Sequence, residues 1–70
     1  MNISDLYKEA KSYKMMLENQ SIDQYEFKDL IESLKIADQI KENADEFSKN
    51  QEIRDYLMTL YNLVSAISSL

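Results

Sequence analysis

The sequence contains no cysteine, histidine, glycine or proline among its 70 residues. Without cysteine the chain can form neither a disulfide nor a thiolate site, and without histidine it lacks the commonest metal ligand and the best proton-transfer group near neutral pH. Without glycine it has no glycine-rich phosphate loop and no Asn-Gly hairpin turn. Helical proteins can close their loops with Asn, Ser and Asp instead. We therefore expect a helical protein that is not an enzyme, with no catalytic residues, metal or cofactor.

The length and the hydropathy of the chain narrow its class further. Seventy residues allow one small domain, which we place at residues 1–70. The opening residues, MNISDLYKEAK, are too polar for a signal peptide, and no stretch reaches the ~18–20 apolar residues that cross a bilayer. We expect a cytoplasmic protein. Its abundance of Ile, Lys, Asn and Tyr is typical of small accessory proteins of bacteria, phages or mobile elements.

Apolar residues recur at alternating steps of three and four in three segments, which is the spacing of amphipathic helices. The spacing predicts helices over residues 3–19, 24–46 and 49–69. Asn2 is the expected N-cap of the first helix, and Asp23 with Glu26 has the spacing of a capping box at the start of the second. Short loops favour antiparallel neighbours, so we expect an all-α, up-down-up three-helix bundle.

The apolar pattern of the second predicted helix changes direction along its length. Its first row consists of Phe27, Leu30, Ile31, Leu34 and Ala37. A second row lies about a third of a turn away and consists of Ile36, Ile40, Ala44 and Phe47. Either a continuous helix touches different neighbours, or the chain breaks. We favour a long helix that kinks or breaks between Asn43 and Asn50.

The last fifteen residues, 56–70, carry no charge at all. Their apolar arc covers more than half of the predicted helix, whereas a helix in a small bundle buries about three-sevenths of its positions. Charge depletion with retained aromatics is typical of the core of an interface. The predicted partner interface consists of Tyr56, Leu60, Tyr61, Leu63, Val64, Ile67 and Leu70. We expect a protein partner or a homo-oligomer, most simply a homodimer. Membrane-surface helices usually pair such a face with Lys and Arg, which are missing here.

All of the net charge of −5 lies in residues 21–55, which carry five bases and ten acids. The predicted acidic patch consists of Asp38, Glu42, Asp45, Glu46 and Glu52. It is either a solvated surface, as acidic runs usually are, or a contact for a basic partner. Direct binding to nucleic acid is not expected, because phosphate neutralisation requires a basic stripe.

These features together favour a small acidic regulator or inhibitor that binds another protein through the third predicted helix. One alternative is a self-assembling structural unit that uses the same face on itself. Another is an acidic mimic of nucleic acid that blocks a basic groove. The segment MNISDLYKEAK resembles the N-capped helix start of some small phage-encoded anti-CRISPR inhibitors. The resemblance is confined to these eleven residues, because the remainder lacks the strand signals that such proteins would bring.

Overall fold

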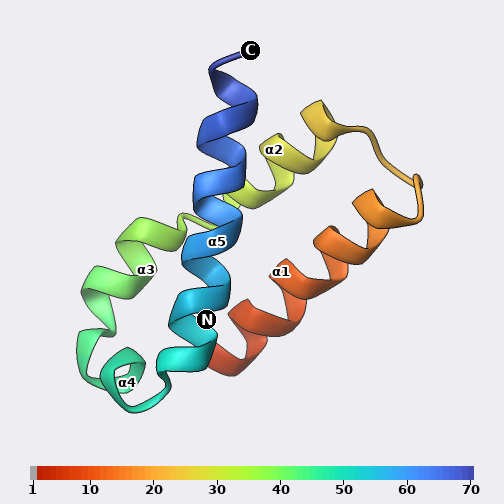
Figure 1. Ribbon diagram of the computed structural model, residues 1–70. Helices are drawn as coiled ribbons and strands as arrows, with labels where there is room; N and C mark the ends of the chain where they lie inside the picture. Colours follow the sequence, from red (N-terminus) through yellow and green to blue (C-terminus); the bar gives the residue numbers. More distant parts are fainter. Residues whose placement is uncertain (1) are drawn as a thin grey trace.

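The computed structural model describes residues 2–70, which form five helices and no strand (Figure 1). The helices are α1 (Ile3–Glu18), α2 (Gln24–Ser33), α3 (Ile36–Glu42), α4 (Ala44–Lys49) and α5 (Gln51–Ser68). In Figure 1, α1 rises, α2 and α3 descend in succession, and α5 rises again between α3 and α1. The predicted all-α class and small helical bundle are confirmed.

The first two helices begin at the predicted caps. The Asn2 side chain accepts a hydrogen bond from the Asp5 amide at 2.8 Å. At α2 the capping box is complete, because the Glu26 amide donates to Asp23 at 2.8 Å and the Asp23 amide donates to Glu26 at 3.2 Å. Each cap satisfies amides that a helix start would otherwise leave unpaired.

The predicted continuous helix over residues 24–46 is wrong, because α2 ends at Ser33 and α3 begins at Ile36. Lys35 lies between them in the left-handed conformation, with φ 52° and ψ 52°. Leu34 and Ile36 are 7 % and 2 % exposed. Residues two apart point to nearly opposite sides of a straight helix, so both could not have faced one core. Burying each is worth ~1.5–3 kcal/mol, which outweighs the ~1–2 kcal/mol cost of a left-handed residue.

The corner between α3 and α5 is built from two asparagines, in the region where a break was predicted. The Asn43 side chain donates to the Gln39 carbonyl at 3.0 Å, and the Asn50 side chain donates to the Glu46 carbonyl at 2.9 Å. Each amide therefore closes the last turn of the helix before it, where carbonyls lack backbone partners. The predicted break between Asn43 and Asn50 is confirmed.

Helix α5 is the centre of the bundle and packs against each of the other four helices. The buried core consists of Ile3, Leu6, Ala10, Phe27, Ile31, Leu34, Ile36, Phe47, Leu57, Leu60, Val64 and Ile67. Every helix contributes at least one of these side chains, and no polar or charged residue among 2–70 is buried. Within the same range, no helix combines the length and the apolar composition needed to cross a bilayer.

Candidate functional site

The structure divides the predicted partner interface between the core and the surface. Leu60, Val64 and Ile67 are buried within the chain itself, which corrects their assignment to a partner-binding surface. Tyr56 and Leu63 are half-buried and pack against the same core. The reason is that the second predicted helix is divided into α2, α3 and α4, so α5 is covered by these three short helices and α1 rather than by two long helices. Only Tyr61, at 42 % exposure, and Leu70, at 85 %, are exposed members of the predicted set.

The exposed side of the second half of α5 still carries no charge. We call this surface the neutral face, and it consists of Thr59, Tyr61, Asn62, Ser65, Ala66 and Ser69. Its hydroxyls bond to their own helix: Thr59 donates to the Asp55 carbonyl at 2.8 Å, and Ser69 donates to the Ser65 carbonyl at 3.0 Å. Ser65 donates to the Tyr61 carbonyl at 3.2 Å in the same way. These hydroxyls keep their carbonyl acceptors when a bound protein displaces the surface water. Covering the neutral face therefore costs less desolvation free energy than covering hydroxyls that bond only to water.

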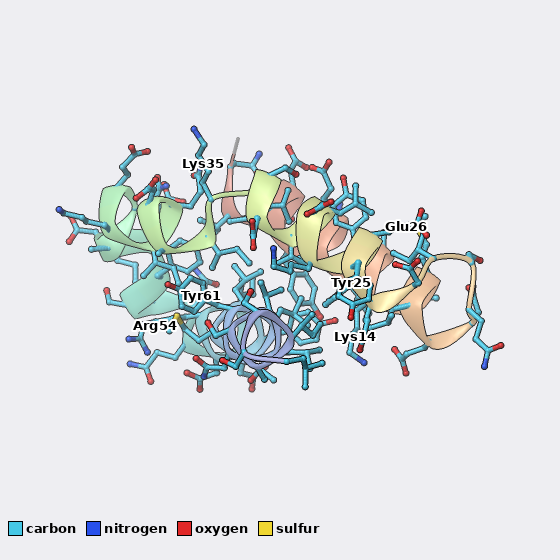
Figure 2. All side chains as sticks on the ribbon, turned by 90° about the horizontal axis from the view of Figure 1, so that it is seen from above. Lys14, Tyr25, Glu26, Lys35, Arg54 and Tyr61 are labelled. Atoms are coloured by element: carbon cyan, nitrogen blue, oxygen red, sulfur yellow. The ribbon has the colours of Figure 1, made fainter. Side chains whose placement is uncertain are left out.

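A groove lies beside the neutral face, between α5 and the junction of α2 with α3. It has a volume of about 400 Å³ and is lined by Ile31, Glu32, Ile36, Tyr61, Val64, Ser65 and Ser68. Its apolar lining comes from the exposed edges of core side chains, and its only ionisable lining groups are the Glu32 carboxylate and the Tyr61 phenol. In Figure 2, Tyr61 lies between α5 and α3, whereas Lys35 points away from α5.

Sequence reasoning found only the α5 side of this groove. The contributions of α2 and α3 depend on the left-handed turn at Lys35, which brings Ile31 and Ile36 to the same wall. The displaced apolar rows of residues 27–47 were the available signal for that turn. Those rows predict a kink or break between Asn43 and Asn50, further along the chain than the turn at Lys35.

The predicted acidic patch is exposed and spread over three helices. Asp38 and Glu42 lie on α3, Asp45 and Glu46 on α4, and Glu52 at the start of α5. None of the five carboxylates forms an ion pair among residues 2–70, where the ion pairs are Lys14–Glu18, Lys28–Glu32 and Arg54–Asp55. No group of three carboxylates in that range is arranged to hold a metal ion. Whether this surface binds a basic partner or is only solvated stays a prediction.

Tyr7 of α1 and Tyr56 of α5 join these two helices through their rings. The rings of Tyr7 and Tyr56 meet edge to face with centroids 5.3 Å apart, and the Lys11 ammonium lies 5.7 Å from the Tyr7 centroid. Burial, followed by the neighbouring Tyr7 and Glu18, raises the pKa of Tyr56. Tyr56 therefore stays protonated at neutral pH and acts as a packing group between α1 and α5.

Tyr13 is a further tyrosine of α1, and its hydroxyl is paired within the same helix. It donates its hydroxyl to Glu9 at 2.8 Å, and this bond, with burial and the Glu9 charge, raises the pKa of Tyr13. A phenol held in the neutral form in this way is a structural hydrogen-bond donor, not a poised base.

No family model, curated protein or solved structure matches the chain. The candidate site is therefore defined by the geometry of the chain alone, as the neutral face of α5 with the adjoining groove.

Proposed function

We propose that this protein is a small, acidic, non-enzymatic regulator or inhibitor of the cytoplasm, which binds another protein through the neutral face of α5. The observation that supports the proposal is the charge-free composition of a surface that is exposed in the single chain. Charged side chains are depleted at interface cores because their desolvation is costly. Each of the other helices carries acids and bases, so the neutral face is the part of the surface best suited to exclude water.

The size of a protein interface requires more than the neutral face. Helix α5 has 18 residues, which corresponds to a length of about 27 Å. A single helix face of that length presents only a few hundred Å², whereas a standard interface buries ~800 Å² on each partner. The total accessible surface of the chain is 4770 Å², so such an interface is feasible. It would extend from the neutral face across the groove onto the end of α2, at Glu32, and the start of α3.

Site-specific photo-crosslinking tests the proposal directly. Tyr61 and Tyr25 are both exposed tyrosines, at 42 % and 60 %, but only Tyr61 belongs to the neutral face. We replace each in turn by p-benzoylphenylalanine and irradiate the protein in a lysate of the organism that encodes it. We expect a discrete adduct from position 61 and none from position 25. The adduct should disappear when Ser65→Lys is added, and should persist when Ser12→Lys is added on exposed α1.

Equal adducts from positions 61 and 25 would show that the neutral face is not a preferred contact. Persistence of the adduct in the Ser65→Lys variant would lead to the same conclusion, because a lysine at the centre of a true interface must be desolvated.

The same surface favours a second candidate function, self-association into a homodimer. The neutral face contains no charge that would repel an identical face on a second copy. Sedimentation velocity over a range of protein concentrations tests this candidate. A dimer that dissociates in the Ser65→Lys variant supports it, and a monomer at all concentrations removes it.

A further inference from the structure

The chain segments on the two sides of the groove differ in net charge. Residues 23–42, which contain α2 and α3, carry six acids and three bases, hence −3, whereas residues 56–70 of the α5 side carry none. No basic residue lines the groove. Lys28 is held at 3.0 Å from Glu32, and Lys35 points away from α5 (Figure 2). The groove therefore combines an apolar floor with one carboxylate, that of Glu32, which shares the ammonium of Lys28 on its outer side.

Resting on the proposed function, we infer that the groove takes one apolar side chain of a basic amphipathic helix of the partner protein, with a Lys or Arg of that helix beside Glu32. Ile31, Ile36 and Val64 supply the apolar floor. A volume of about 400 Å³ is at the small end of binding pockets and suits one or two side chains. On a helix, residues four apart lie on one face, so an anchor and a cation can reach the floor and Glu32 together.

Charge complementarity selects this occupant over a second copy of the chain. A second copy carries a further −5, and its own neutral face contains no base that could approach Glu32. A basic helix gains from the net charge of −3 of residues 23–42 during the approach and from the Glu32 carboxylate in the complex. The Tyr61 ring at the rim adds a surface on which the aliphatic stem or the charge of a Lys or Arg can pack.

The test uses two synthetic helical peptides with the same leucine face, one with a lysine-rich polar face and one with a glutamate-rich polar face. Each is titrated into the 70-residue protein, and binding is followed by fluorescence anisotropy. We expect the lysine peptide to bind at least about tenfold more tightly, which corresponds to ~1.4 kcal/mol. Amide chemical shifts of the labelled protein should change mainly at the residues that line the groove.

Two matched variants locate the contact. Glu32 and Glu18 are each the i+4 partner of a lysine on a helix surface, but only Glu32 lines the groove. We expect Glu32→Gln to weaken binding of the lysine peptide about two- to fivefold, the range of an exposed ion pair. Glu18→Gln should leave the affinity unchanged. Ser65→Lys should weaken binding more than Ser12→Lys does, because only Ser65 lines the groove.

The inference is overturned if both peptides bind equally, or if Glu18→Gln and Glu32→Gln have the same effect. It is also overturned if a homodimer that dissociates in the Ser65→Lys variant occupies the groove. These outcomes can be separated from failure of the proposed function. A partner adduct at position 61 without lysine-peptide binding would leave the proposed function standing. Absence of that adduct would count against the proposed function whatever the peptides do.

Discussion

Replacement of Lys35 by glycine should stabilise the protein, although glycine usually weakens helical proteins. Lys35 has φ 52° and ψ 52°, lies on the surface and forms no ion pair among residues 2–70. The left-handed conformation costs an L-residue ~1–2 kcal/mol, and glycine removes this cost. Glycine in turn loses about 0.5–1 kcal/mol more conformational entropy on folding. We therefore expect Lys35→Gly to raise the free energy of unfolding by ~0.5–1 kcal/mol.

Urea unfolding followed by circular dichroism measures this change. With a slope of about 1 kcal/mol per molar urea, the midpoint should rise by ~0.5–1 M, and the melting temperature by ~2–8 °C. Lys8→Gly is the matched control, because Lys8 is an exposed lysine inside α1. Glycine at that position should lower the free energy of unfolding by ~1 kcal/mol. Gln20, with φ 66°, should respond to glycine as Lys35 does. If Lys35→Gly destabilises the protein as much as Lys8→Gly, α2 and α3 form one continuous helix and the reasoning fails.

Three further predictions concern the core, a cap and the pH dependence. Phe47→Ala should lower the free energy of unfolding by ~3–5 kcal/mol and abolish the cooperative melt seen by circular dichroism, whereas Phe47→Leu should keep that melt. Equal melts of the two variants would show that Phe47 is not a core residue. Asp23→Ala should lower the free energy of unfolding by ~1 kcal/mol in urea titrations, and Asp29→Ala inside α2 by less; equal losses would rule out the capping box. The pKa of Tyr56 is raised in the folded state, so the protonated phenol stabilises the folded protein. This stabilisation is complete below the unfolded pKa of about 10 and is lost as pH rises further. Tyr56→Phe should therefore lose less stability than the wild type above pH ~10, as measured by urea midpoints, with Tyr25→Phe behaving as the wild type; identical profiles for both variants would contradict the burial of Tyr56.

The parts of the fold that sequence reasoning predicted are those fixed by neighbouring residues. The cap at Asn2 and the capping box of Asp23 and Glu26 each involve groups three residues apart. The asparagine breaks at Asn43 and Asn50 are also local, because each side chain donates to a carbonyl four residues back. Such bonds form wherever the local sequence permits them, so one stretch of sequence is enough to predict them.

The left-handed turn at Lys35 could not be predicted in this way, because its cause is tertiary. Nothing in the local sequence favours that conformation for lysine, and the turn exists because Leu34 and Ile36 both reach the core. The candidate site likewise has features that local sequence determines and features that tertiary packing determines. The charge-free composition of the last fifteen residues could be read directly from the sequence. The burial of Leu60, Val64 and Ile67, and the groove itself, depend on which helices cover α5.

The short lengths of α3 and α4 have a consequence for how the protein opens. With seven and six residues, neither helix reaches the ~12–15 residues that a helix needs to persist alone in water. Ile36 and Phe47 are their only fully buried side chains, so the two helices are attached to α5 at few points. Their amides should exchange with solvent deuterium together and ahead of those of α1, α2 and α5. Four of the five carboxylates of the acidic patch, Asp38, Glu42, Asp45 and Glu46, would then leave the bundle as one segment, while Glu52 stays on the folded α5.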